Sequence, residues 1–475
     1  MHRRAFLSTL AAAPLAARAE TRPNIVFILL DDLGWRDFNV YGGAHHETPE
    51  VDRLAREGAR FTNAYAACPV CSPTRASILT GKYPARLQLT DWIPGRKQWP
   101  AAKLSVPSFE QQLPLRETTI AEALKAAGYR TGSIGKWHLG GKGFLPEQQG
   151  FDVNVGGDAR GGIGSFFGPF PMPGLETTTK DDYITDALTA AAERFIEESA
   201  AARQPFFLYL PHYTVHLPLS VPEPIAARYR AKFGDRPFPV AEYAAMVETF
   251  DRSLGRIRAK LDALGLARNT ILFVTSDNGG LRYEGSGKRL ITDNSPLRAG
   301  KGHCYEGGIR DPLIVHWPGV TRPGAVYDAP VISPDFFPTI LDMAGAAPAR
   351  GLDGMSLAPL LRTGRPPKRE AVYWHYPHYS NQGGVPSGAV RKGDWKLIEF
   401  YEDGRVELYN LRTDVSERRN LANAESRRAA ELLGLLRRWR AEVNATMPTS
   451  NPNYDPSAAN QGLTGAEAPT PPAAR

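Results

Sequence analysis

Cysteine is scarce in this sequence: the 475 residues include only Cys68, Cys71 and Cys304. Three cysteines cannot build a disulfide framework, and an odd number leaves at least one thiol outside any disulfide. The chain also lacks the compositional bias of disordered, collagen-like or coiled-coil proteins, since 42% of its residues are hydrophobic and 23% are charged. The length allows two or three globular domains, each with a core of its own.

The sequence has no block of lysine and arginine of the kind that nucleic-acid-binding proteins carry. Its formal charge of +7 falls to +4 when Arg3, Arg4 and Arg18 are set aside, because they lie in a segment that we expect to be removed. After that segment, no apolar run is long enough for a transmembrane helix. We therefore expect neither a nucleic-acid partner nor stable insertion into a membrane.

Residues 1–19 have the pattern of a bacterial export signal. Basic residues 2–4 precede an apolar stretch at 5–17, and the small residues at 17–19 offer a cleavage site. Residues 3–7 also match a twin-arginine signal, which carries folded proteins, although an ordinary signal with two chance arginines gives the same pattern. The sequence predicts a periplasmic or secreted protein.

Short apolar runs alternate with amphipathic patterns over residues 20–365. Runs rich in β-branched and aromatic residues predict buried strands at 24–30, 206–210 and 271–274. Apolar residues at helical spacing, bounded by capping residues and glycine, predict helices at 49–57, 119–127 and 243–264. This alternation predicts an α/β domain with a doubly wound, largely parallel sheet flanked by helices.

The pattern changes after the linker near residue 365. Short strands at 395–398 and 406–409 flank a predicted Asp403-Gly404 turn, and a helix follows from about residue 424 to residue 443. Residues 366–447 are therefore predicted to form a smaller α+β subdomain on an antiparallel sheet. Residues 448–475, rich in proline and alanine, are predicted to form a flexible tail.

Polar residues follow four predicted strands at their carboxyl ends, where open α/β sheets place their reactive sites. Acids after a strand more often cap a helix or form a turn, but four such ends on one edge of a sheet predict a functional site. The carboxylate and amide side chains among them offer oxygen ligands, which suit Ca²⁺ or Mg²⁺ better than zinc. The four groups are Asp31 with Asp32, Lys136 with His138, His212 with His216, and Asp277 with Asn278.

Residues 68–81 place a thiol at the start of a predicted helix. Ser72 is predicted as its N-cap and Pro73 as its first helical residue. Cys71 would then lie just outside the helix N-terminus, where backbone amides and the helix dipole favour negative charge. Arg75, one turn along, can point to the same place. This arrangement suggests that Cys71 supplies a nucleophile.

The segment Cys71-Ser72-Pro73-Thr74-Arg75 matches the Cys-x-Pro-x-Arg signature of type I sulfatases. These arylsulfatase-like enzymes depend on formylglycine and belong to the alkaline phosphatase superfamily. The resemblance covers most of the chain, in the order of that family: segments 24–34, 48–55, 76–81, 135–140, 276–279, 300–310 and 408–421. It implies hydrolysis of a sulfate ester, on a carbohydrate, to an alcohol and inorganic sulfate.

The resemblance also implies how the reaction proceeds. In this family a formylglycine-generating or sulfatase-maturating enzyme oxidises the signature cysteine, here Cys71, to an aldehyde whose hydrate is the nucleophile. One hydroxyl attacks sulfur, and deprotonation of the other expels sulfate and restores the aldehyde, a route closed to a simple Ser or Cys adduct. A divalent cation, Ca²⁺ rather than Mg²⁺, would be held by Asp31, Asp32, Asp277, Asn278 and the modified Cys71.

The same resemblance assigns the remaining site residues. Lys136 and Lys301 would bind the sulfate oxygens, and Arg75 would fix the diol. His216 would protonate the leaving alcohol, and His138 would aid regeneration of the aldehyde. His212 follows the same predicted strand as His216, but the family position precedes an x-Pro pair, which His216 fits better.

Other residues keep open interpretations. Cys304 is predicted to be a buried, inert thiol. Loops carrying Trp92, Trp374, His375 and His378 either line the entrance of the site and contact a sugar, or expose these side chains without a function.

Three alternatives compete with the sulfatase interpretation. A phosphate-ester hydrolase of the same fold would use a Ser or Thr nucleophile with two zinc ions, and this sequence lacks the additional histidine ligands. A thiol oxidoreductase could use Cys68 and Cys71 as a dithiol, but it would leave Arg75, the acids and the lysines without a role. An inactive, sulfatase-derived binding module is disfavoured by the intact ligand set.

Overall fold

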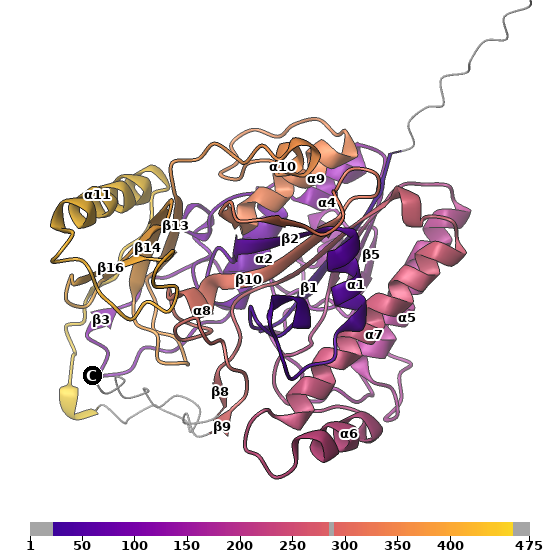
Figure 1. Ribbon diagram of the computed structural model, residues 1–475, viewed down its shortest axis with the longest axis horizontal. Helices are drawn as coiled ribbons and strands as arrows, with labels where there is room; N and C mark the ends of the chain where they lie inside the picture. Colours follow the sequence, from indigo (N-terminus) through magenta and orange to yellow (C-terminus); the bar gives the residue numbers. More distant parts are fainter. Residues whose placement is uncertain (1–21, 285–288, 459–475) are drawn as a thin grey trace, which may run out of the picture.

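The computed structural model of the protein describes residues 22–284 and 289–458. The predicted export signal and the last part of the predicted tail therefore lie outside the described residues. Figure 1 shows a large twisted sheet between layers of helices and, at one end, a second sheet covered by a long helix. No helix in the described part of the chain is long and apolar enough to cross a membrane.

Within the described residues the large sheet has nine strands and is largely parallel, which confirms the predicted fold class. Its order is β11-β2-β10-β7-β1-β6-β4-β5, with β12 also paired to β2. Strands β7, β1, β6, β4 and β5 run parallel to one another, whereas β10 is antiparallel to both of its neighbours. The strands are β1 (Asn24–Leu30), β2 (Ala59–Tyr65), β4 (Arg130–Ile134), β5 (Val153–Val155), β6 (Phe206–Pro211), β7 (Thr270–Ser276), β10 (Arg310–His316), β11 (Ala325–Tyr327) and β12 (Val331–Ile332).

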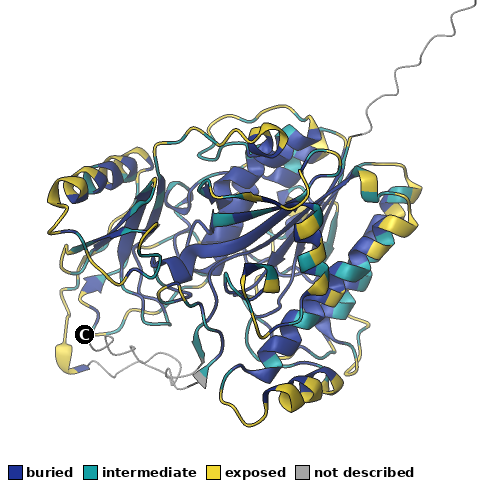
Figure 2. Cartoon of the chain, viewed as in Figure 1, coloured by how far each residue is buried: buried dark blue, intermediate teal, exposed yellow. Residues whose placement is uncertain are grey.

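Alternate side chains of each central strand enter two separate cores, because successive residues of a strand point to opposite faces. In β1, Val26 and Ile28 join the core under α1 (Pro49–Glu57), α5 (Ile184–Ala201), α6 (Glu223–Phe233) and α7 (Ala241–Ala263). Phe27 and Leu29 join the opposite core, under α2 (Cys71–Thr80), α4 (Ile120–Ala126), α9 (Phe336–Ala344) and α10 (Ala358–Thr363). Figure 2 shows the buried strands between helices whose outer faces are exposed.

The second sheet is antiparallel, in the order β13-β14-β15-β16. Its strands are β13 (Val372–Tyr376), β14 (Ser387–Lys392), β15 (Trp395–Phe400) and β16 (Val406–Asn410), and α11 (Ser426–Glu442) packs across them. The shorter elements are β3 (Leu104–Ser105), α3 (Pro84–Leu87), β8 (Tyr283–Glu284), β9 (Arg289–Leu290), α8 (Glu306–Ile309) and β17 (Thr449–Ser450), with 3₁₀ turns at Asn39–Tyr41, Pro146–Gln149, Ala267–Asn269, Ser333–Asp335 and Pro456–Ala458.

The beginning of the predicted tail is attached to the body of the protein. Strand β17 pairs antiparallel with β3. Beyond it, the backbone N–H of Asn451 donates to the carbonyl of Lys103 (2.9 Å) and that of Asp455 to the carbonyl of Pro100 (2.9 Å). The backbone hydrogen bonds thus continue past residue 448, whereas residues 459–475 lie outside the described part.

A buried network of charges joins the two sheets. Lys396, on β15, places its ammonium 2.8 Å from Glu306 and 2.9 Å from Glu417. The guanidinium of Arg310 donates to Glu306 (2.6 Å), whose backbone N–H donates to Glu417 (2.7 Å). Burial would raise both glutamate pKa values, but Arg310 and Lys396 hold the pKa of Glu306 well below its usual range, whereas burial beside Glu306 raises that of Glu417 to about 7.

Candidate active site

The four polar groups predicted to follow strands meet at one edge of the large sheet. Strands β7, β1, β6 and β4 are adjacent and parallel, so their carboxyl ends lie side by side. Backbone hydrogen bonds continue beyond the strand ends: Asp31 N–H donates to Thr214 (3.0 Å), Lys136 N–H to Pro211 (2.7 Å) and Asp277 N–H to Leu30 (3.1 Å). Each polar segment is therefore fixed to its neighbour.

Helix α2 brings Cys71 and Arg75 to the same edge, but it begins earlier than predicted. Cys71 is the first helical residue and Val70 is the N-cap, so the prediction that Ser72 caps the helix was wrong. The Ser72 hydroxyl instead accepts the backbone N–H of Ile93 (3.2 Å), which binds the helix to the segment that follows it in the chain. Cys71 thus lies within the first turn, where unpaired backbone amides favour negative charge.

Three buried ion pairs form the centre of the site. Burial raises the pKa of Asp277 to about 6, with the negative Asp31 adding to the effect. Burial would also raise the pKa of Asp32, but the ammonium of Lys301 holds it well below its usual range. The three carboxylates and three cations cancel in formal charge. The pairs are Arg75 with Asp277 (2.9 Å), Lys136 with Asp31 (2.7 Å) and Lys301 with Asp32 (2.7 Å).

Two oxygens in this cluster are buried and have no hydrogen-bond partner among the described residues: Asp31 Oδ1 and Asn278 Oδ1. The amide nitrogen of Asn278 donates to Asp32 (2.8 Å), which fixes the orientation of that side chain. One ligand atom each from Asp31, Asp32 and His216 lie within 4.8 Å of one another. Such carboxylate and amide oxygens fit a hard divalent cation, and a buried acceptor without a partner is rare otherwise.

The imidazole of His138 has a defined tautomer and faces Cys71. Its Nε2 lies 2.6 Å from the carbonyl oxygen of Ile93, which can only accept, so Nε2 carries the proton. Its Nδ1, with a free lone pair, lies 3.4 Å from the sulfur of Cys71. Burial, with the charge of Lys136 added, lowers the pKa of His138 well below its ordinary value. His138 is thus a neutral base directed at residue 71.

The two histidines after β6 have different surroundings. His212 points into the core, with Nε2 3.3 Å from the Ser253 hydroxyl, and burial lowers its pKa to about 4. His216 faces the site: its Nδ1 donates to the carbonyl of Leu217 (2.9 Å) and its Nε2 lies 3.7 Å from Asp32. The position of His216, and not that of His212, agrees with the predicted site.

A cavity of about 370 Å³ opens above these residues. Of the predicted site residues, Asp32, Cys71, His138, His216 and Lys301 line it, whereas Asp31, Arg75, Lys136, Asp277 and Asn278 are fully buried. The sequence interpretation missed further lining residues, among them Gly161, Gly162, Asn381 and Gln382. These come from loops far from the recognisable motifs, and no signal in the sequence marked them.

The predicted loop aromatics and histidines have mixed outcomes. Trp92 lines the cavity. Trp374 and His375 do not lie in loops: both are on β13 and buried, with Trp374 Nε1 donating to the Ala66 carbonyl (2.8 Å) and His375 held by Tyr401 (2.8 Å). His378 follows the strand but is also buried, with its ring nitrogen 2.8 Å from the Thr90 hydroxyl. Trp374 packs toward the first sheet, against Tyr65 and Ala66, whereas His375 is held by Tyr401 and by the carbonyl of Thr446 (3.0 Å).

The three cysteines are buried and unpaired. Burial raises the pKa of the Cys71 thiol, raises that of Cys68 well above its ordinary value, and raises that of Cys304 to about 11. A redox dithiol needs a stabilised thiolate, so these surroundings argue against the oxidoreductase alternative.

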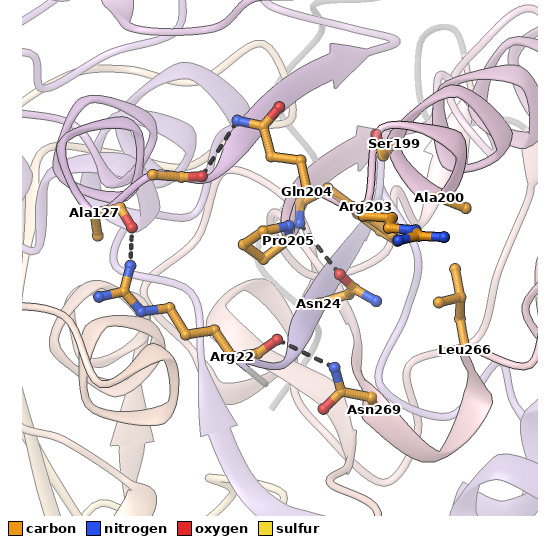
Figure 3. A pocket seen from close by; sticks show the side chains of 12 residues that line it. Arg22, Asn24, Ala127, Ser199, Ala200, Arg203, Gln204, Pro205, Leu266 and Asn269 are labelled. Atoms are coloured by element: carbon orange, nitrogen blue, oxygen red, sulfur yellow. Dashed lines mark hydrogen bonds between the residues drawn. The ribbon is translucent and has the colours of Figure 1, made fainter. Parts of the chain in front are cut away.

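A second cavity, of about 580 Å³, lies at the opposite edge, by the amino ends of β1 and β6 (Figure 3). Hydrogen bonds within the chain occupy several of its polar groups: Asn269 donates to the carbonyl of Arg22 (3.1 Å), Gln204 to that of Gly128 (3.2 Å), and Asn24 accepts the Phe206 N–H (3.2 Å). The buried carboxylates and cations that act on each other in the first cavity have no counterpart among these lining residues.

Comparison with known proteins agrees with this geometry. The sulfatase family model matches residues 23–346, and the model of the N-sulphoglucosamine sulphohydrolase C-terminal region matches residues 300–439. A sulfatase from Formosa agariphila is 33% identical over 91% of this chain and 92% of its own length. Human arylsulfatase A is 35% identical over 84% of this chain and 78% of its own. N-acetylgalactosamine-6-sulfatase of Canis lupus familiaris is 34% identical over 78% of this chain and 72% of its own length.

Solved structures are similar as well. Ps i-CgsB, crystallised with a neocarrahexaose, superposes with a TM-score of 0.75 at 28% identity, over 88% of this chain and 92% of its own. A protein whose structure was solved with D-glucosamine-2-N,6-O-disulfate superposes with a TM-score of 0.70 at 26% identity, over 89% of this chain and 98% of its own. Taken with the sheet edge and its charged cluster, these similarities place the chain in the sulfatase family, whose members hydrolyse sulfate esters.

Proposed function

We propose that this sulfatase cleaves the sulfate ester of a saccharide, with the hydrate of a formylglycine at position 71 as the nucleophile. The observation that carries the proposal is the surroundings of Cys71. This residue begins α2 and faces the lone pair of His138 in a cavity that Lys301 also lines. The names of relatives and of bound ligands, which refer to N-acetylgalactosamine 6-sulfate, glucosamine sulfate and carrageenan-type saccharides, support a carbohydrate substrate.

We assign a divalent cation, Ca²⁺ in preference to Mg²⁺, to the oxygens of Asp31, Asp32, Asp277 and Asn278 with the modified residue 71. The unpartnered oxygens of Asp31 and Asn278 support this assignment. When bound, the cation lowers the pKa of the attacking hydroxyl and offsets charge on the sulfuryl oxygens. Because the three carboxylates and three cations of the site already cancel, a divalent ion would leave two positive charges. That excess matches a sulfate monoester together with a deprotonated hydroxyl.

The lysines hold the sulfate group in this proposal. Each ammonium has three N–H donors. Lys301 uses one on Asp32 and lines the cavity, so its other donors can reach sulfate oxygens. Lys136 pairs with Asp31 beneath the cavity and adds positive charge from below. Arg75 donates from Nε to Asp277 and from Nη1 to the carbonyl of Lys136 (3.0 Å), which fixes the position of the ligand carboxylate and of the lysine backbone.

The two histidines that line the cavity move protons at opposite ends of the reaction. Because Nδ1 of His216 donates to the Leu217 carbonyl, Nε2 is the atom on which a second proton would be carried and from which it would pass to the departing alcohol oxygen. Burial lowers the pKa of His216, and the neighbouring carboxylates of Asp31 and Asp32 act in the opposite direction. His138 presents an unprotonated Nδ1 to residue 71. It takes the proton of the remaining hydroxyl, so that the electron pair of that oxygen re-forms the carbonyl as sulfate leaves.

We also propose the route by which the enzyme matures. A formylglycine-generating or sulfatase-maturating enzyme converts Cys71, and the export signal over residues 1–19 directs the product to the periplasm or the medium. Residues 20–365 form the catalytic domain and residues 366–447 the smaller subdomain, whose antiparallel sheet and final helix lie within those bounds.

The test is expression with and without a formylglycine-generating enzyme. Peptide mass across Cys71 should show loss of sulfur and gain of an aldehyde. Sulfate release from an aryl sulfate and from N-acetylgalactosamine 6-sulfate should rise with the converted fraction, and Cys71→Ser should give no turnover. An unmodified thiol in fully active protein would contradict the proposed nucleophile.

A further inference from the structure

The loop between β13 and β14 carries Asn381 and Gln382 from the second sheet to the wall of the cavity. This loop has a fixed shape. The N–H of Ser380 donates to the carbonyl of Gly384 (2.9 Å), and the N–H of Gly384 donates back to the Ser380 hydroxyl (2.8 Å). Its conformation therefore depends on its own hydrogen bonds.

The loop is also packed closely against the segment that carries Lys301. A Cβ atom built on Gly302, whose φ is +83°, would overlap the side chain of Ser380, and one built on Gly384 would overlap the carbonyl of Gly302. The backbones approach so closely that only glycine fits at both positions. The loop and the lysine next to Gly302 thus form one rigid wall, and a group on the loop keeps its position relative to the sulfate-binding lysine.

Asn381 has unused hydrogen-bonding capacity in this wall. Its side-chain oxygen is shielded from solvent and has no hydrogen-bond partner among the described residues, although the residue lines the cavity. Whichever way the amide is turned, one end of it is unsatisfied. Buried polar atoms without a partner are uncommon and costly, and they point to a ligand where they border a cavity.

The cavity that Asn381 lines is mainly apolar. Trp92, Ile93, Pro94 and Leu217 line the same cavity. An apolar and aromatic wall with a few placed polar groups is the usual construction of a small-molecule site, and the volume of about 370 Å³ is near the lower end of the range for such sites. Such a site can pack the C–H face of one sugar ring and bind its polar substituents through an amide.

We propose that Asn381 determines specificity for the sugar: its amide hydrogen-bonds a hydroxyl or acetamido group of the single hexose or hexosamine residue that carries the sulfate. Trp92 contacts the ring of the same residue. This inference rests on the proposed sulfatase function and names the part of the substrate that the loop of the second sheet recognises. An aryl sulfate has no such substituent, so its hydrolysis does not use this contact.

The test compares two substrates on the matured full-length enzyme. We expect N381A to lower kcat/KM for N-acetylgalactosamine 6-sulfate about tenfold more than for 4-methylumbelliferyl sulfate, the loss typical of one hydrogen bond to a neutral group. The control N453A removes an exposed amide outside the cavity and should leave both values unchanged. An equal loss on the two substrates, or none on either, overturns the inference.

A second measurement does not depend on the folding of a variant. For the wild type, we expect one deoxy or deacetylated analogue of the sugar sulfate to lose about tenfold in kcat/KM, and N381A to be insensitive to that same change. Additive losses at every position overturn the role of Asn381 and leave the sulfatase function intact. Absence of sulfate release from every substrate by converted, metal-loaded wild type overturns the proposed function and, with it, this inference.

Discussion

Replacing Lys396 by methionine would test how the second sheet is joined to the catalytic one. The ammonium of Lys396 is fully buried, 2.8 Å from Glu306 and 2.9 Å from Glu417. Methionine keeps roughly the volume of the side chain, but it leaves two buried carboxylates neutralised only by the guanidinium of Arg310 on Glu306 and by the charge of Arg391. Removing one member of a buried ion pair costs about 3–5 kcal/mol, so we expect K396M to lose that much stability at pH 8.

The loss should depend on pH in a defined direction. The pKa of Glu417 in the folded protein, about 7, already lies above its ordinary value of 4.5. A carboxyl with a raised folded pKa binds its proton more tightly in the folded state, so its contribution to stability is present below pH 4.5 and is lost as the pH rises through 7. Without Lys396, the pKa of Glu417 rises further. K396M should therefore be less destabilised at pH 5 than at pH 8. A tenfold tighter binding of the Glu417 proton gives a difference of about 1 kcal/mol between these two pH values, because the carboxyl of the variant still holds part of its proton at pH 8.

The assay is urea unfolding at pH 5 and pH 8, followed by tryptophan fluorescence, with K392M as the matched control. Lys392 also contacts two glutamates, Glu370 (3.3 Å) and Glu431 (2.9 Å), but at the surface. Exposed pairs contribute about 0–1 kcal/mol, so K392M should change little at either pH. A cost of K396M below about 1 kcal/mol at pH 8, or an equal cost at both pH values, would refute this reasoning.

Three further predictions concern the active site. His216→Ala should slow hydrolysis of sugar sulfates, which have poor leaving groups, by about 10²–10⁴-fold and activated aryl sulfates far less; equal losses would remove His216 as the acid. Chelation should abolish activity and lower the unfolding temperature, and Ca²⁺ should restore both; restoration by Zn²⁺ alone would contradict the oxygen-ligand assignment. Cys68→Ser should keep wild-type kcat/KM, because the buried Cys68 thiol forms no disulfide and its sulfur contacts the carbonyl of Thr90 (4.0 Å). Loss of turnover in a variant that still folds would support the dithiol alternative instead.

Much of the fold could be predicted from local patterns. Unbroken apolar runs identified strands such as Asn24–Leu30, because a strand buried on both faces has apolar residues at every position and no alternation with polar ones. The predicted meeting of polar strand ends also held, since β7, β1, β6 and β4 are neighbours in one parallel register. The carboxylates are brought together by topology, and topology follows from the alternation of strands and helices.

The errors and omissions arise where tertiary contacts outweigh local preference. Serine is a residue type favoured at helix N-caps, but the Ser72 hydroxyl accepts the Ile93 N–H and the helix begins at Cys71. Trp374 and His375 lie in a segment that resembles a loop in the sequence but forms β13, the edge strand of the second sheet, from which Trp374 reaches the carbonyl of Ala66. Asn381 reaches the cavity only because Gly302 and Gly384 let two backbones approach, and no local pattern encodes that contact.

The burial of Cys71 has a consequence for the order of events in the life of the chain. Only 4% of the residue is exposed, at the foot of a cavity whose wall is rigid. If Cys71 is converted as proposed, the oxidising enzyme has to reach a side chain that the first turn of α2 and the cavity enclose once they have formed. In the proposed maturation, conversion would therefore precede folding. Protein purified as the thiol would remain a thiol however long it is incubated with the maturating enzyme, and only unfolding and refolding in its presence would give the residue a second opportunity.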